Sequence, residues 1–206
     1  MPAFAALRPR ALSLGLALAA SAAVVASGLV GPRPLPILGW AAAFVFLVVE
    51  SDVRCRRIPN WVTFPAPGLA LALALLLHGS AGLVAALLGV ATAFGLLLVP
   101  YAVGALGAGD VKAAMALGAL LGPSATLALL AFALGFGGLI ALLKVAASGE
   151  ARDVLRRWYL SVANLVATRR WVFLTAEPGS AADGGIPFAV ALGFAVAAEL
   201  AREGIR

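Results

Sequence analysis

Hydrophobic residues along the chain gather into apolar stretches bounded by glycine, proline or charged residues. A helix needs about 20 residues to cross the ~30 Å hydrocarbon core of a bilayer, so apolar runs near that length indicate membrane-spanning helices. Some of the runs are shorter, and the pattern predicts an all-α, polytopic integral membrane protein with about six or seven transmembrane helices. The stretches cover residues 11–30, 35–49, 61–77, 83–101, 111–121, 124–145 and 186–200.

Composition agrees with this pattern, because 63% of the 206 residues are hydrophobic and only 12% are charged. A soluble core of this size could not bury so much apolar surface. Glycine and proline lie in the segments between the stretches, where they interrupt helices. The interruptions include 31–36, 51–60, 78–82, 107–110, 122–123 and a long polar segment at 146–185.

The positive charges predict how the chain is oriented. Most Lys and Arg residues fall at the N-terminus, in 51–60, directly after 107–110, or in 144–170. With the N-terminus inside, alternate crossings place all of these sites in the cytoplasm, as the positive-inside rule requires. The prediction is a multi-pass protein of the cell inner (cytoplasmic) membrane. This topology places three positively charged residues on the opposite side of the membrane: Arg33, Arg202 and Arg206.

The first apolar stretch has two interpretations. Arg8 and Arg10 precede a run that ends in small residues, which is the layout of a cleaved secretory signal. The run is long for such a signal, and its length favours a retained first helix.

Few residues are available for histidine, cysteine or metal chemistry. Cys55 and His78 are the single members of their kinds, so a disulfide, a cysteine-rich zinc site and a Ser/His/Asp triad lack the residues they need. We expect no metal and no cofactor, and we expect His78 to be an interfacial residue on the far loop. Nucleic acid is not an expected partner, because membrane topology already accounts for the basic residues.

Two carboxylates stand apart from the other acids. Asp52 follows the second apolar stretch and Asp110 opens the fifth. Two crossings separate them, so both aspartates return to the same membrane face. Acids near a membrane are costly and by default suggest a functional site. The fifth stretch has about 11 residues at ~1.5 Å each, and so short a helix could draw Asp110 into the bilayer.

Simpler interpretations stay open for both residues. Asp110 could be the N-cap of the helix that follows, with the glycines supplying only a turn. Asp52 could be an interfacial acid paired with Arg54 or Arg56. The two acids could also form the ion or proton site of a small membrane transporter.

Three segments together resemble one family, the type IV prepilin peptidases. SDVRCRRIPN at 51–60 resembles the family's Asp-containing motif that ends in Ile-Pro-Asn, and GAGDVK at 107–112 resembles its GxGD motif. GGIPFAVALGFA at 184–195, which contains Pro187, is similar to the start of the family's C-terminal helix. The segments occur in the family's order over roughly residues 37–196.

The resemblance implies a membrane-embedded aspartic endopeptidase with its active site facing the cytoplasm. Such enzymes remove the short basic leader from prepilin-like proteins, and the implied catalytic residues are Asp52 and Asp110. Larger members carry a cysteine-containing cytoplasmic domain and methylate the new N-terminus. We expect this chain to lack such a domain, and it resembles the small, peptidase-only branch of Flp or Tad pili and archaeal preflagellins. A presenilin-type protease also shares GxGD, but its first aspartate lies within a helix.

Several neighbouring residues are assigned supporting roles. Gly107 and Gly109 would form a flexible active-site turn that carries Asp110. Close helix packing is the alternative for small residues in this region, and it is the favoured interpretation of Gly118. Three further positions complete the set: Ile58 belongs to the motif, Pro59 suits the first turn of the third helix, and Asn60 can satisfy backbone groups.

Lys112 is expected to point to a different side of the helix from Asp110 and to act as a surface anchor. A basic amphipathic segment at 151–176 is expected to lie at the cytoplasmic membrane surface. Its alternatives are binding of anionic lipid and a lid or substrate guide beside the active site.

The predicted organisation has three parts. Residues 1–36 form a first helix and an external turn, 37–200 form the peptidase-like membrane domain with the cytoplasmic loop 146–185, and 201–206 form a tail. The expected partners are prepilin-like substrates and the lipid bilayer, and the sequence leaves the oligomeric state open.

Overall fold

The computed structural model describes residues 3–169 and 188–205, and all regular structure in these two ranges is helical. The prediction of an all-α protein is therefore confirmed. The helices are α1 (Ala3–Gly28), α2 (Leu35–Cys55), α3 (Asn60–Thr63), α4 (Pro65–Ala102), α5 (Ala108–Leu121), α6 (Pro123–Ser148), α7 (Ala151–Thr168) and α8 (Phe188–Ile205).

Within the described residues, four helical stretches are long and apolar enough to cross a membrane. They are Arg10–Gly28, Leu35–Cys55, Asn60–Ala102 and Pro123–Ser148. Large aliphatic side chains such as Leu76, Val99 and Leu142 are largely exposed on the outside of the bundle. Lipid tails are as apolar as leucine, so such a surface suits a bilayer. The chain is a membrane protein.

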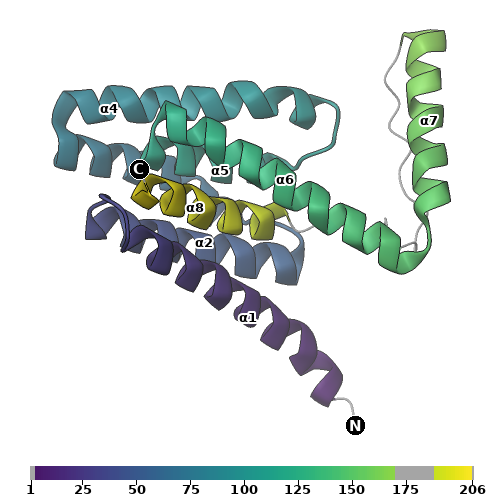
Figure 1. Ribbon diagram of the computed structural model, residues 1–206, viewed down its shortest axis with the longest axis horizontal. Helices are drawn as coiled ribbons and strands as arrows, with labels where there is room; N and C mark the ends of the chain where they lie inside the picture. Colours follow the sequence, from purple (N-terminus) through teal and green to yellow (C-terminus); the bar gives the residue numbers. More distant parts are fainter. Residues whose placement is uncertain (1–2, 170–187, 206) are drawn as a thin grey trace.

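The long helix α4 is bent back on itself at Gly79. The backbone there has φ 64° and ψ −153°, a left-handed conformation that glycine adopts readily. Figure 1 shows the two halves of α4 running in opposite directions. They correspond to the predicted third and fourth stretches, and the expected interruption at 78–82 is narrower than predicted.

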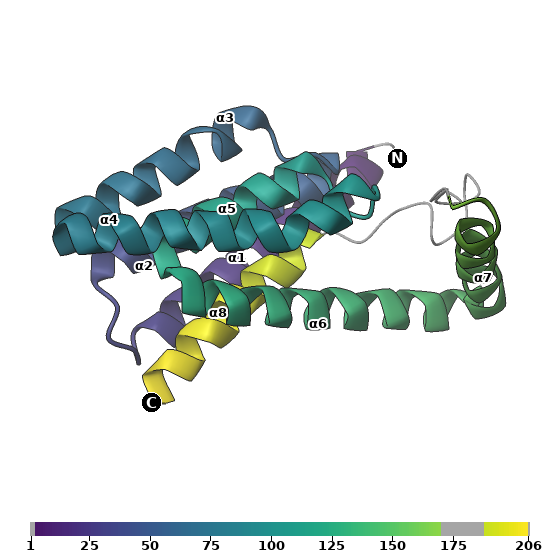
Figure 2. The same ribbon diagram turned by 90° about the horizontal axis from the view of Figure 1, so that it is seen from above.

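Helix α8 lies in the centre of the bundle, between α1 and α2 on one side and α6 on the other (Figures 1 and 2). Gly193 allows this close approach, because a Cβ at that position would lie 3.0 Å from Val45 Cγ1 and 3.1 Å from Ala20 Cβ. The helix continues to Ile205, so the predicted tail at 201–206 is helical as far as that residue.

The second half of α4 packs against α5 through facing glycines. A Cβ on Gly89 would lie 1.9 Å from the carbonyl oxygen of Gly118, and a Cβ on Gly118 would lie 2.6 Å from that of Gly89. The predicted packing role of Gly118 is confirmed. Gly104, another small residue of this region, has no such packing role. Nothing lies within 4 Å of its Cβ position, and its φ of 77° marks a turn.

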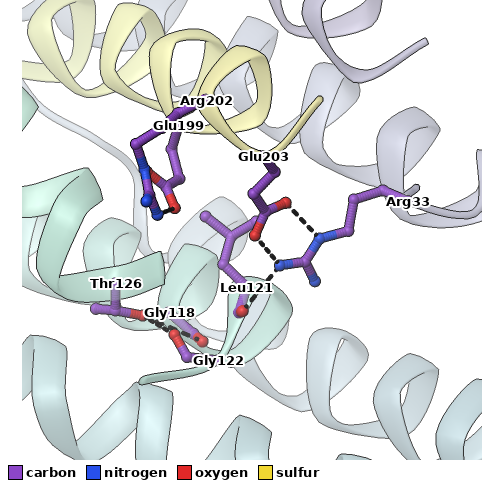
Figure 3. A network of polar contacts seen from close by, with 8 residues as sticks. All are labelled: Arg33, Gly118, Leu121, Gly122, Thr126, Glu199, Arg202 and Glu203. Atoms are coloured by element: carbon purple, nitrogen blue, oxygen red, sulfur yellow. Dashed lines mark hydrogen bonds and ion pairs between the residues drawn. The ribbon is translucent and has the colours of Figure 1, made fainter. Parts of the chain in front are cut away.

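A polar network ties elements together at the end of the bundle where α5 and α8 finish (Figure 3). The guanidinium of Arg33 donates to both carboxylate oxygens of Glu203, at 2.8 and 2.6 Å, and to the Leu121 carbonyl at 3.1 Å. Arg202 pairs with the fully buried Glu199 one turn away. His78 lies at this same end, exposed at the rim of a smaller cavity that Arg33 also lines.

Two predicted loops begin or end at different residues from those expected. Helix α2 continues through the motif to Cys55 and stops where Arg56 adopts a left-handed φ of 50°. In the same way, residues 108–110 form the first turn of α5 instead of a loop. A helix can continue through polar residues beyond its apolar stretch. The pattern of apolar residues alone therefore does not predict where these helices begin and end.

Helix α7 lies apart from the bundle. Figure 1 shows it at the end of α6, crossing the direction of the bundle helices, and Figure 2 shows it nearly end-on. The expected helical segment at 151–176 is thus helical over Ala151–Thr168. Residues 170–176 and Pro187 lie outside the described residues.

Candidate active site

Asp52 lies in the last turn of α2, at the opposite end of the bundle from the Arg33 network. Its Oδ2 accepts a hydrogen bond from the backbone N–H of Ala189, at 3.1 Å. Ala189 is the second residue of α8, and the first N–H groups of a helix have no partner within that helix. The carboxylate therefore satisfies one of these groups and ties the end of α2 to the start of α8.

The structure does not pair Asp52 with Arg54, one of the two arginines that the alternative interpretation named. Arg54 instead pairs with Glu50, one turn earlier on α2, at 3.4 Å. Residues four apart on a helix share a face, whereas residues two apart do not, which explains the choice of partner. Arg56, four residues after Asp52, lines the same cavity, and its charge acts on the Asp52 carboxylate.

Asp110 lies in the first turn of α5. Gly107 is the N-cap, with φ −79° and ψ 153°, and Asp110 is three residues further on. Its Oδ2 accepts the Gly107 backbone N–H at 3.1 Å, which is the contact that an acidic residue at this position makes in a capping box. The interpretation of Asp110 as the N-cap itself is wrong by three positions, although the residue does help to cap the helix.

The two aspartates line one cavity of about 620 Å³, together with residues of the 51–60 and 107–110 segments. The pKa of Asp110, which lies between the candidate spans, is raised to about 6. Burial is the largest cause and the charge of Asp52 is the second, while the hydrogen bond from Gly107 acts in the opposite direction. The carboxylates are therefore near enough to repel each other. The cavity is lined by Ser51, Asp52, Cys55, Arg56, Arg57, Ile58, Pro59, Asn60, Gly107, Ala108, Gly109 and Asp110.

The turn at Ile58, Pro59 and Asn60 packs directly on the start of α5. A Cβ on Gly109 would lie 3.1 Å from Ile58 Cβ and 3.5 Å from the Ile58 carbonyl oxygen. Gly109 thus allows backbone and side chain to approach closely, and it lies inside the helix rather than in a turn. Pro59 is the N-cap of α3 instead of its first residue, one position from the expectation.

Lys112 has a specific partner in the same region. Its Nζ donates to Asn60 Oδ1 at 3.0 Å and lies 5.9 Å from the centre of the Phe64 ring. The sequence predicts a surface anchor for Lys112 and a bond to backbone groups for Asn60. Instead, their side chains connect α5 to α3 beside the cavity.

The contribution of α8 to Asp52 was missed at the residue level. A signal is present in the sequence, because the segment at 184–195 resembles the start of the family's C-terminal helix and follows the predicted cytoplasmic loop. A helix start offers unpaired N–H groups, and a nearby carboxylate is a suitable acceptor. Among the described residues, no group of three His, Cys, Asp or Glu side chains is arranged to hold a metal ion.

A bundle of apolar helices with two carboxylates in one cavity at its end defines a membrane protein with a candidate hydrolytic site. The type IV leader peptidase family matches residues 39–142 of the chain, a segment that contains both aspartates. The chain belongs to this family, and it is accordingly a peptidase of the type IV leader class. Neither the curated proteins nor the solved structures contain a significant match.

Proposed function

We propose that this protein is a membrane-embedded aspartic endopeptidase that cleaves the short basic leader from prepilin-like substrates, with Asp52 and Asp110 as its catalytic pair. One observation carries the proposal: carboxylates from α2 and α5 line one cavity, and the charge of one raises the pKa of the other. Family membership supports the type of reaction.

The chemistry follows from two carboxyl groups that share one proton. The ionised carboxylate takes a proton from water as that water attacks the scissile carbonyl carbon, and the protonated group gives its proton to the leaving amine. Like charges held close together disfavour double ionisation, so below about pH 6, where Asp110 holds its proton, the pair is poised with one acid and one base. The pair titrates as a unit, and its apparent pKa values belong to both groups.

The surrounding residues are assigned positioning roles in this proposal. The Ala189 N–H holds Asp52, the Gly107 N–H holds Asp110, and Gly109 lets the Ile58 turn close over the start of α5. The hydrogen bond between Lys112 and Asn60 holds that turn against α5. In this arrangement the GxGD glycines serve capping and close approach.

Location and organisation follow from charge and topology. Arg54, Arg56 and Arg57 lie at the cavity end of the bundle, and the positive-inside rule places such an end in the cytoplasm. The site would then meet the leader before the substrate leaves the cytoplasmic face of the inner membrane. Residues 37–200 would form the catalytic unit, and 1–36 an additional helix and turn.

The test is cleavage of a co-expressed prepilin-like protein from the same genome. The variants are Asp52→Asn and Asp110→Asn, which keep shape and hydrogen-bond acceptors but remove the charge. General acid and base groups each contribute roughly 10²- to 10⁴-fold in rate, so each variant should lose at least about 100-fold in cleavage. Asp153→Asn on α7 is the matched control and should cleave normally.

Substrate processing is followed by the loss of leader mass, at matched amounts of each variant in the membrane. Normal cleavage by either Asp52→Asn or Asp110→Asn would overturn the two-carboxylate mechanism. Cleavage of another membrane peptide, with the prepilin-like protein left intact, would retain the mechanism and reject the substrate.

A further inference from the structure

Helix α7 carries an apolar stripe that no described part of the chain covers. Its members are Leu155, Tyr159, Val162 and Val166, whose spacing of four, three and four residues places them on one face. Leu155, Tyr159 and Val166 are 70%, 72% and 77% exposed. A contiguous, exposed apolar face of this kind indicates a surface that is covered in the working protein.

Arginines border the stripe. Arg152 and Arg156 lie three residues before Leu155 and Tyr159, so each is a neighbour of a stripe residue on the helix surface. Both are exposed. Arg157 lies across the helix, where its Nε donates to the Asp153 carbonyl oxygen at 3.3 Å. Apolar residues bordered by cations suit a surface that has hydrocarbon beneath an anionic layer.

The position of α7 fits a bilayer surface. Helix α6, a candidate membrane span, ends at Ser148, and only Gly149 and Glu150 separate it from α7. Gly149 has a φ of 72°, and this left-handed residue ends α6 and turns the chain. Figures 1 and 2 show α7 crossing the direction of the bundle helices, which is the direction a helix takes when it lies along a membrane.

We propose that α7 binds the anionic lipid headgroups of the leaflet at the active-site end, with its stripe in the upper acyl region and its arginines on lipid phosphates. A lipid surface fits better than a protein groove. The helix begins where a membrane span ends, and the charges border the stripe on the side where headgroup phosphates would lie. This surface is separate from the Asp52 cavity and does not depend on the proposed function.

The experiment compares amide hydrogen exchange of the full chain in two kinds of nanodisc, one of phosphatidylcholine alone and one containing phosphatidylglycerol. Exchange over residues 151–168 should slow by about tenfold in the anionic discs, since basic residues near such a surface each add to the attraction. High salt should remove this difference because it screens the charges. Exchange in α5 serves as the internal reference for folding.

Two sets of variants locate the effect. Leu155→Gln/Val162→Gln should restore fast exchange in anionic discs, and Arg152→Gln/Arg156→Gln should remove the dependence on phosphatidylglycerol. The matched control is Leu160→Gln, which alters an exposed leucine of α7 outside the stripe and should behave as the unmodified chain.

Exchange that is equally fast in both discs would overturn the proposal. Slow exchange that is the same in both discs and unchanged by the stripe variant would overturn it as well. Slowing that occurs only when a prepilin-like protein is added would identify the stripe as a protein-docking surface, which also rejects the lipid assignment.

Discussion

At the scale of single residues, Asp110 combines two properties that oppose each other. Its carboxylate accepts the Gly107 N–H and so helps to cap α5, an interaction that favours the ionised form. Burial and the charge of Asp52 favour the neutral form, and they prevail, because the pKa is raised to about 6. A helix cap alone would leave this residue ionised well below that pH.

A pH-dependent stability follows from this pKa. The folded chain holds the Asp110 proton from the unfolded pKa near 3.8 up to about 6, so stability falls as pH rises through that window. Asp110→Asn is neutral at every pH and can still accept the Gly107 N–H. It should match the unmodified chain near pH 3.5 and be more stable at pH 7.5, by at most about 3 kcal/mol.

The measurement is thermal unfolding in detergent at both pH values. Asp153→Asn, an exposed acid on α7, is the control and should leave the pH dependence unchanged. Equal melting temperatures for Asp110→Asn and the unmodified chain at pH 7.5 would contradict the burial argument.

At the scale of elements, the cavity depends on contacts between α5, α8 and the 58–60 turn. The sequence predicted the separate parts: two acids on one face, a short fifth helix, and a helix start near residue 186. Their contacts follow from packing between distant segments, which apolar periodicity does not encode. The Ala189 bond to Asp52, the Ile58 contact with Gly109 and the Lys112 bond to Asn60 all belong to this class.

Gly109→Ala tests one of these contacts. Alanine favours the helix, but its Cβ would meet Ile58 Cβ at 3.1 Å, so the 58–60 turn must shift by a few tenths of an ångström. Small displacements of positioning groups have large effects on rate, and we expect a loss of roughly tenfold or more in leader cleavage with folding intact. Cleavage assays at matched membrane levels provide the measurement.

The matched control for that variant is Gly95→Ala, another helical glycine, whose Cβ position has nothing within 4 Å. It should cleave normally and be as stable as the unmodified chain or slightly more so. If Gly109→Ala also cleaves at the normal rate, the close approach of the Ile58 turn has no functional role.

At the scale of the whole molecule, topology brings the two aspartates together. The two halves of α4 run in opposite directions between Asp52 and Asp110, and both residues line one cavity at the same end. Counting crossings was enough to predict this. It could not predict that α8 would fill the bundle centre and link both ends, because its central position depends on packing against α1, α2 and α6 together.

The Arg33 network provides the last prediction, because it joins the α1–α2 turn, α5 and α8 at the end away from the cavity. Arg33→Gln should lower stability by roughly 1–3 kcal/mol, since it removes charge-assisted bonds to Glu203 and the bond to the Leu121 carbonyl. Arg33→Lys should recover only part of this, because an ammonium group cannot reproduce the fork of the guanidinium. Thermal unfolding of these variants and the unmodified chain provides the measurement. Arg54→Gln is the control. It loses only the 3.4 Å surface pair with Glu50 and should change stability by less than about 1 kcal/mol. Cleavage per folded molecule should stay normal in Arg33→Gln; a stable protein with impaired cleavage would instead mean that this end of the bundle acts on the distant cavity.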